Sequence, residues 1–193
     1  RINEDQSDAQ FTIAFDPLNF EGSEGANRWV GGSRSDHMLG KGGADRFFGN
    51  GGADTLLGGA GDDWLEGGSG ADQIDGDIGS DTVSFRTLGK VELSLYGSLA
   101  ATGGAEADTL ISIENVEGTS SGGDRLRGSS TANTLWGLGG DDVLEGKNGD
   151  DILDGGLGID RVIGGDGQDT APASRDYQNS IEPRDALRTD PYP

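Results

Sequence analysis

The chain has 193 residues, of which 32% are hydrophobic, and its 35 acidic and 14 basic side chains give a formal charge of −21. Nucleic acid and anionic membrane surfaces would repel such a chain, and no apolar run approaches the ~20 residues of a membrane helix. The absence of cysteine excludes disulfides and thiolate metal sites. With 37 glycines the apolar core must be thin, so something besides apolar burial has to stabilise the fold.

Residues 1–21 begin polar and then alternate, with Phe11, Ile13 and Phe15 on one side of the stretch FTIAF. This alternation predicts a strand. Because the open end of a repeated β structure exposes its core, we expect residues 1–21 to form an N-terminal cap. The chain begins at Arg1 and carries no signal peptide, so we expect a processed chain or an excised part of a longer one.

A nine-residue frame runs without a break through residues 22–84, and its most regular part, residues 58–75, reads GGAGDDWLE GGSGADQID. Glycines fill the early positions, an Asp or Asn fills the sixth and an apolar residue fills the eighth. The sixth positions are Asn27, Asp36, Asp45, Asp54, Asp63, Asp72 and Asp81. The eighth positions are Trp29, Met38, Phe47, Leu56, Leu65, Ile74 and Val83. Apolar residues kept in phase in this way argue against a disordered acidic chain.

Residues 85–118 lose most of this motif, although Val91, Leu93 and Leu95 still alternate as in a strand. The stretch 85–102 is as long as two repeats, and Asp108 follows Asp81 by three repeats in frame. We therefore expect the repeat structure to continue through this metal-poor bridging segment. A hinge between two separate repeat structures is the alternative.

The frame resumes in residues 119–172, where its sixth positions are Asp124, Asn133, Asp142, Asp151, Asp160 and Asp169. The eighth position fails at Ala171, which predicts the end of the repeats. Residues 173–193 are polar, contain three prolines and show no strand or helix period, as expected of a C-terminal tail.

The spacing of glycine and aspartate predicts calcium sites. Glycine allows the turn to adopt positive φ and to point its carbonyls inward, and the sixth-position Asp adds a carboxylate. Calcium takes 6–8 oxygen ligands, more than one turn supplies. If two nonapeptides make one coil, turns 18 residues apart stack and share an ion. The strongest pairs are then Asp45–Asp63, Asp54–Asp72, Asp63–Asp81, Asp142–Asp160 and Asp151–Asp169.

Weaker pairs follow from the same spacing, and two sites are expected to be missing. The weaker pairs are Asn27–Asp45, Asp36–Asp54, Asp124–Asp142 and Asn133–Asp151. Lys90 and Leu99 stand 18 residues after Asp72 and Asp81, so no ion is expected at those steps. About seven Ca²⁺ in all would reduce the net charge from −21 to about −7.

The repeats in residues 22–84 and 103–172 resemble the RTX (repeats-in-toxin) family of secreted bacterial calcium-binding proteins, and ISIENVEG followed by DRLRG resembles the linkers of that family. The resemblance implies an all-β fold, a right-handed parallel β-roll or β-solenoid. It also implies type I secretion and folding on external calcium. The C-terminal ALRTDPYP lacks the acidic-hydrophobic pattern expected of a type I secretion signal.

Catalytic motifs are not expected in this chain. Its one histidine, His37, cannot form a His-x-x-x-His zinc motif, and the Asp in each glycine-rich turn would repel a phosphate. We therefore expect a protein that is not an enzyme.

An apolar outer surface is the last sequence feature with functional content. The ninth position should face outward, yet consecutive repeats carry Val30, Leu39, Phe48 and Leu57, and Trp64 and Trp136 are also predicted on outer faces. Residues 1–21 could cover them, or they could form a docking face for another protein. Three functions stay open: a structural subunit of an extracellular assembly, the non-catalytic module of a larger secreted enzyme or toxin, and a calcium-dependent adhesin that binds carbohydrate through Trp64 or Trp136.

Overall fold

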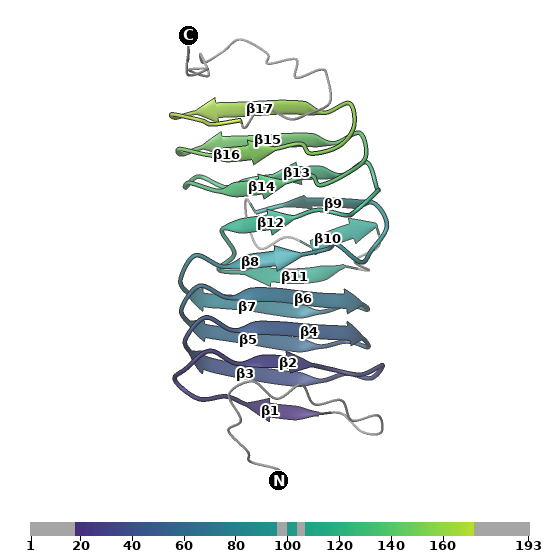
Figure 1. The fold of residues 1–193 in the computed structure, drawn as a ribbon, viewed down its shortest axis with the longest axis vertical. Coiled ribbons are helices and arrows are strands. Elements are labelled where there is room, and N and C mark those ends of the chain that lie inside the picture. The colour runs from purple at the N-terminus through teal and green to yellow at the C-terminus, as the bar shows by residue number, and fades with distance from the viewer. Residues whose placement is uncertain (1–17, 96–99, 104–106, 172–193) are drawn as a thin grey trace.

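The computed structural model describes residues 18–95, 100–103 and 107–171, and every regular element in these ranges is a β-strand. The strands form a ten-stranded and a seven-stranded sheet that run together along one rod (Figure 1). Because most neighbouring strands are parallel, the predicted all-β roll is confirmed. The predicted FTIAF strand and the tail 173–193 lie outside the described residues.

Successive strands alternate between the two sheets along most of the chain. In spatial order the first sheet contains β1 (Asn19–Glu21), β3 (His37–Gly42), β5 (Thr55–Ala60), β7 (Gln73–Ile78), β11 (Asp108–Ile111), β10 (Ala100–Gly103), β9 (Val91–Ser94), β13 (Arg125–Arg127), β15 (Val143–Asn148) and β17 (Arg161–Asp166). The second contains β16 (Ile152–Asp154), β14 (Thr134–Trp136), β12 (Asn115–Glu117), β8 (Thr82–Ser84), β6 (Trp64–Ser69), β4 (Arg46–Gly51) and β2 (Arg28–Val30).

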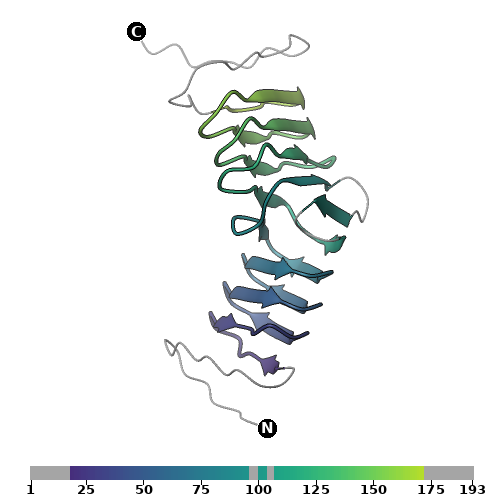
Figure 2. The same cartoon turned by 90° about the vertical axis from the view of Figure 1, so that its right-hand side faces the viewer.

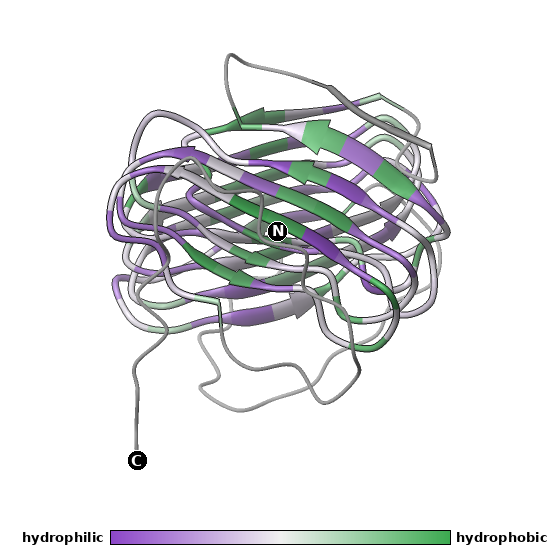
Figure 3. Ribbon diagram, turned by 90° about the horizontal axis from the view of Figure 1, so that it is seen from above, coloured by the Kyte–Doolittle hydropathy of each residue, from purple (hydrophilic) through white to green (hydrophobic). Residues whose placement is uncertain are grey.

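The strand register confirms that two nonapeptides make one coil. Met38 aligns with Leu56 where β3 pairs with β5, and Phe47 aligns with Leu65 where β4 pairs with β6. Each partner lies 18 residues away, so equivalent positions stack in columns along the roll. Viewed from above, the coils superpose, and hydrophobic residues alternate with hydrophilic ones along the strands (Figure 3).

One eighth-position side chain from each repeat fills the narrow space between the sheets. Met38, Phe47, Leu56, Leu65, Ile74 and Val83 are all 0% exposed. Full burial of such a side chain contributes roughly 1.5–3 kcal/mol. A core with one large side chain per nine residues gives each repeat little stability beyond this contribution, which agrees with the thin core predicted from composition.

The first rung of the roll begins inside the segment predicted as a cap. β1 pairs in parallel with β3 and aligns Phe20 with Met38. The rings of Phe20 and Trp29 stack at 5.0 Å, and those of Trp29 and Phe47 stack at 5.2 Å. Residues 19–21 are therefore part of the repeat structure, with Phe20 in the column of core residues, although the nonapeptide motif begins only after them.

Between the two repeat blocks the chain does not follow the predicted path. β9 pairs in parallel with β13, β11 pairs in parallel with β7, and β10 runs antiparallel between β9 and β11. The first sheet thus gains two strands here, and these strands depart from the regular stacking (Figure 2). The in-frame spacing led to the wrong path for this segment. A repeat would advance the chain by half a coil, whereas the β9–β10 hairpin reverses its direction.

The second sheet remains continuous across this insertion. β12 pairs in parallel with β8 on one side and with β14 on the other, so the two blocks share one sheet without interruption. The alternative of a hinge between two separate rolls is therefore also wrong: the blocks form one stack with a local insertion.

Candidate metal centre

The turns of the roll form two columns, one along each edge, and each turn ends in the sixth-position residue of its repeat. Turns that lead into the first sheet end in Asp36, Asp54, Asp72, Asp124, Asp142 and Asp160. Turns that lead into the second sheet end in Asn27, Asp45, Asp63, Asp81, Asn133 and Asp151, and Asp169 closes the same column. All but Asn27 and Asp169 are buried.

The sixth-position side chains link each coil to the next. The Asp45 N–H donates to Asp63 Oδ1 at 2.7 Å, and the Asp63 N–H donates to Asp81 Oδ1 at 2.8 Å. The same bond joins Asp54 to Asp72 (2.7 Å), Asp142 to Asp160 (3.0 Å) and Asp151 to Asp169 (3.0 Å). It also joins the weaker pairs Asn27–Asp45, Asp36–Asp54, Asp124–Asp142 and Asn133–Asp151. The two members of every pair predicted by the 18-residue spacing therefore lie next to each other, along one or the other edge of the roll.

A second hydrogen bond divides these turns into two classes. In four turns the sixth-position side chain also accepts an N–H from the start of its own turn. We call these the capped turns: Ser23 to Asn27 (3.0 Å), Gly32 to Asp36 (2.8 Å), Thr119 to Asp124 (2.6 Å) and Ser129 to Asn133 (2.7 Å). An Asp or Asn side chain that caps its own turn is a common turn stabiliser. In the capped turns the side-chain oxygens already have donors.

The other turns leave a carboxylate oxygen without a donor, and we call them the open turns. Within the described part of the chain, the buried Oδ2 atom makes no hydrogen bond in Asp45, Asp54, Asp63, Asp81, Asp142, Asp151 and Asp160. Each of these seven open turns has a positive φ at its second position, and these residues are Lys41, Asn50, Gly59, Asp77, Leu138, Lys147 and Gly156. Left-handed conformations in side-chain-bearing residues store strain of roughly 1–2 kcal/mol each. A buried, unpartnered carboxylate beside a strained backbone requires a further partner.

The first glycine of a turn, capped or open, marks where oxygens of two coils converge. A Cβ on Gly40 would collide with both Asp45 Oδ2 and the carbonyl oxygen of Gly58 in the next coil. Gly49 has the same surroundings, formed by Asp54 Oδ2 and the Gly67 carbonyl. Only a residue without a Cβ fits here, because the space is taken by a carboxylate of one turn and a carbonyl of the next.

The electrostatics of the open turns also indicate a missing positive charge. Burial raises the pKa of Asp45, Asp54 and Asp142 from 3.8 to about 7, with neighbouring carboxylates adding to the effect. The pKa values of Asp81 and Asp151 rise to about 6 for the same reasons. Hydrogen bonds from backbone N–H groups act in the opposite direction but do not compensate for burial. Without a cation, these carboxylates therefore resist ionisation near neutral pH.

The donor set fits calcium. In the described ranges, no three His, Cys, Asp or Glu side chains gather into one metal-binding group. A cation in these turns would instead be held by carboxylate oxygens together with backbone carbonyls. Calcium is a hard cation that takes such mixed oxygen ligands, whereas zinc prefers nitrogen and sulfur. The residues that fit this role best are the open-turn aspartates.

Two acidic residues that the spacing did not predict occupy positions in the two columns. The Asp72 N–H donates to Asp108 Oδ1 at 2.8 Å, and the Asp81 N–H donates to Glu114 Oε2 at 2.9 Å. The expectation that Lys90 and Leu99 follow Asp72 and Asp81 in the columns was wrong, because the β9–β10 hairpin is inserted at this point. Lys90 pairs with Glu92 at 3.5 Å, and Leu99 lies outside the described residues.

The sequence held a signal for only one of these two residues. Asp108 ends the stretch GGAEAD, which keeps the repeat motif, but its partner lies 36 residues away. Glu114 belongs to no repeat, so only the folded chain reveals its place.

The predicted apolar outer surface is split between the two sheets. Val30 aligns with Phe48 across β2 and β4, whereas Leu39 aligns with Leu57 across β3 and β5. Consecutive repeats alternate between sheets, so residues that follow one another in the sequence do not form one stripe. All four side chains are partly buried.

The two tryptophans lie on the outer face of the second sheet but in different surroundings. The Arg46 guanidinium lies 4.3 Å from the ring centre of Trp64, and Arg28 and Arg46 also cover the Phe48 ring at 4.8 and 5.3 Å. Trp136 aligns with Glu117 and Asp154 on the neighbouring strands. Both indoles are partly buried.

His37, the only histidine of the chain, is exposed at the start of β3. No helix in the part of the chain that the structure describes is long and apolar enough to cross a membrane.

A family model described as the RTX calcium-binding nonapeptide repeat (4 copies) matches residues 21–56, 30–65, 48–83, 119–153 and 145–171. The matches overlap within each block, together cover more than half of the chain, and stop on either side of β9, β10 and β11. Comparison with curated proteins found no match.

Proposed function

The chain belongs to the RTX calcium-binding repeat family, and from this membership we propose that its open turns bind several calcium ions on which folding depends. The observation that carries the proposal is the set of buried open-turn carboxylate oxygens without a hydrogen-bond donor. A buried carboxylate is costly unless a cation or a donor satisfies it. Calcium between neighbouring open turns would supply the missing charge and relieve the repulsion between them.

The ions are assigned to pairs of turns in adjacent coils, each pair with at least one open turn. These are the turns of Asp45–Asp63, Asp63–Asp81, Asp54–Asp72, Asp142–Asp160 and Asp151–Asp169. About seven ions in total would reduce the formal charge of −21 to about −7. The four capped turns are weaker candidates, because their side-chain oxygens already accept backbone N–H groups.

The physical argument for calcium-dependent folding combines the thin core with the charge of the turns. Each coil buries few apolar side chains, and the conformational entropy of so glycine-rich a chain opposes folding. Extracellular calcium modules bind with dissociation constants of about 10⁻⁴–10⁻³ M. A chain with such affinities stays unfolded at cytosolic calcium levels and folds outside the cell.

RTX repeats are typical of secreted proteins, and on this basis we place the chain outside the cell or at the cell surface of a bacterium, with type I secretion as the route. Its role there would be that of a structural or interaction subunit of an extracellular assembly. The roll itself is a non-catalytic fold. The alternatives are the RTX module of a larger secreted enzyme or toxin, which a full-length precursor would reveal, and an adhesin, for which glycan binding by Trp64 or Trp136 is the test.

Circular dichroism with and without calcium tests the proposal. We expect the β-sheet signal to appear on addition of millimolar Ca²⁺ and to disappear on addition of excess EGTA. Magnesium at the same concentration serves as the control, because it demands a smaller octahedral site and should not replace calcium. A β-sheet signal that persists unchanged in EGTA at neutral pH would contradict calcium-dependent folding.

A further inference from the structure

The short connection between β11 and β12 reproduces the contacts of an open turn, although it lies outside the residues matched to the repeat family. It contains Ser112, Ile113 and Glu114 and packs against the turn of residues 76–81 in the preceding coil. In the repeats, the following turn supplies two groups to its neighbour: a side-chain carboxylate and a glycine carbonyl. The connection supplies both groups from a shorter chain.

The carboxylate comes from Glu114. Its Oε2 atom accepts the Asp81 N–H at 2.9 Å, which is the bond that Asp81 Oδ1 accepts from Asp63 one coil earlier, at 2.8 Å. Glutamate is one methylene longer than aspartate, and this extra reach compensates for a connection shorter than a full turn.

The carbonyl comes from Ser112. A Cβ on Gly76 would collide with the Ser112 carbonyl oxygen and with Asp81 Oδ2, as a Cβ on Gly40 would collide with the Gly58 carbonyl and Asp45 Oδ2. Ser112 also has a positive φ of 50°, and Asp77 in the facing turn has a φ of 68°. Oxygens therefore converge beside Gly76 as they do beside the glycines of the open turns.

Asp81 faces this point with a carboxylate oxygen that has no donor. Asp81 is 0% exposed, and within the described residues its Oδ2 atom makes no hydrogen bond. The facing connection is held in place from its other side, because Asn133 Nδ2 donates to the Glu114 carbonyl oxygen at 2.8 Å. The arrangement thus has a fully buried acceptor, a second carboxylate and a fixed carbonyl.

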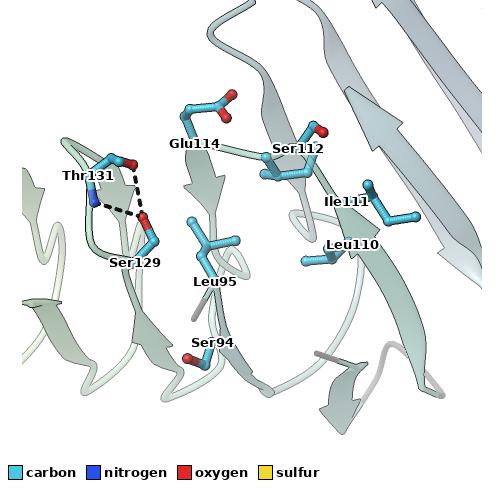
Figure 4. A pocket seen from close by; sticks show the side chains of 9 residues that line it. Ser94, Leu95, Leu110, Ile111, Ser112, Glu114, Ser129 and Thr131 are labelled. Atoms are coloured by element: carbon cyan, nitrogen blue, oxygen red, sulfur yellow. Dashed lines mark hydrogen bonds between the residues drawn. The ribbon is translucent and has the colours of Figure 1, made fainter. Parts of the chain in front are cut away.

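Two residues of the proposed site also border a pocket. Ser112 and Glu114 lie along the wall of this pocket, whose lining also includes Leu95, Leu110 and the hydroxyl-bearing residues Ser129 and Thr131 (Figure 4). Glu114 is only partly buried. Glu114 is therefore the more accessible of the two carboxylates, whereas Asp81 is fully buried.

We propose that Asp81, Glu114 and the Ser112 carbonyl bind a calcium ion at the junction between the two repeat blocks. This inference rests on the proposed function, because it extends the calcium column past the end of the first block. The column that leads into the second sheet then continues from Asp81 through Glu114 towards Asn133 and Asp151. The ion ties the blocks together where the β9–β10 hairpin is inserted into the first sheet.

The test compares Glu114→Gln with Glu117→Gln in the full chain. Glutamine keeps an oxygen that can accept the Asp81 N–H, so the fold is retained while the charge needed for calcium is removed. Glu117 lies three residues later, and its carboxylate approaches Arg86 Nε at 3.7 Å, so the control changes the same charge away from the site. Bound calcium is counted by equilibrium dialysis at a concentration where circular dichroism shows every variant folded.

We expect Glu114→Gln to lose one calcium ion per chain and Glu117→Gln to lose none. Hydrogen exchange at saturating calcium should also quicken in residues 76–84 and 112–117 of the Glu114 variant alone. A Glu114→Gln protein that binds as many ions as the wild type overturns this inference and leaves the proposed function intact. A wild-type chain that binds no calcium removes the proposed function itself.

Discussion

The capped turns and the open turns use the same nine-residue frame, but the oxygens of their sixth-position side chains have different hydrogen-bond partners. In the capped turn at residues 31–36, Gly32 donates its N–H to Asp36 Oδ2, and a carboxylate oxygen is satisfied within the turn. In the open turn at residues 58–63, Gly59 has a φ of 106° and Asp63 Oδ2, within the described residues, has no donor. One kind of turn is complete as the chain folds, and the other leaves a buried charge for an outside partner.

The arrangement of the two classes along the chain is regular. The first block starts with the capped turns of Asn27 and Asp36 and continues with open turns, and the second block starts with the capped turns of Asp124 and Asn133 and does the same. We interpret the capped turns as metal-independent starts from which each block extends.

Acidification should have the largest effect, and it should act on the open turns. The pKa of Asp45, Asp54 and Asp142 is about 7 in the folded roll and starts from 3.8, so between these pH values the folded chain binds more protons than the unfolded chain. The free energy of unfolding of the metal-free roll therefore falls as pH rises from about 4 through about 7.

We expect the calcium-free chain to gain β-sheet signal in circular dichroism when it is acidified from about pH 8 to about pH 5. With limiting calcium the sign reverses, because protons compete for the carboxylates and release the metal. A calcium-free chain with the same spectrum at both pH values would contradict the assignment of raised pKa values to the open turns.

Matched Asp→Asn changes should separate the two turn classes next. Asp63 contacts the turns of both Asp45 and Asp81, so Asp63→Asn should weaken the binding of two calcium ions. The calcium concentration at the midpoint of folding should rise by about tenfold or more, which corresponds to ~1.4 kcal/mol. Asp36→Asn should bind as many ions as the wild type, because an Asn oxygen serves the same cap in Asn27 and Asn133. Equilibrium dialysis counts the ions; the loss of a single ion in Asp63→Asn would argue against shared ligands.

Gly→Ala changes at the second turn position test the difference in backbone crowding between open and capped turns. At the second position of the open turn, Gly59 has a φ of 106° and a Cβ there would collide with the Lys41 carbonyl oxygen, so Gly59→Ala should cost about 1–3 kcal/mol. A Cβ on Gly32 in the capped turn would meet nothing within 4 Å, so Gly32→Ala should be neutral or stabilise the fold by ~0.4–1 kcal/mol. Thermal unfolding at saturating calcium measures both; equal stability of the two variants would refute the difference in crowding.

The smallest effect is expected from the strained second position. Leu138 has a φ of 71°, a conformation that glycine adopts without penalty, so Leu138→Gly should raise the free energy of unfolding by about 1 kcal/mol. The change Ser129→Gly at the same position of a capped turn without positive φ also removes the hydroxyl's hydrogen bonds to Asn133 and Thr131, so it should lower the free energy of unfolding by about 1 kcal/mol or more. Denaturant unfolding in calcium gives both values, and a destabilised Leu138→Gly would show that the left-handed backbone is not strained here.

Most of the fold could be predicted from the sequence because the repeat is strict. A period of nine with an apolar eighth position placed Leu56 and Leu65 in the core and put pairs such as Asp45 and Asp63 at one edge. The insertion could not be predicted, because residues 85–102 carry no motif and their length happens to keep the frame. Strand alternation around Leu93 was visible, but whether that strand advances the roll or reverses it depends on contacts with β13.

The candidate site divides in the same way. The residues that stand at the turns follow from the sequence alone, since glycine and aspartate at fixed spacing leave few other backbone paths. Which turns are capped and which are open depends on the folded chain, because an N–H of the same turn either reaches the side-chain oxygen or does not. The tertiary structure also brought Glu114 beneath Asp81 across 33 residues, a contact made by the pairing of β8 with β12 and by no local pattern.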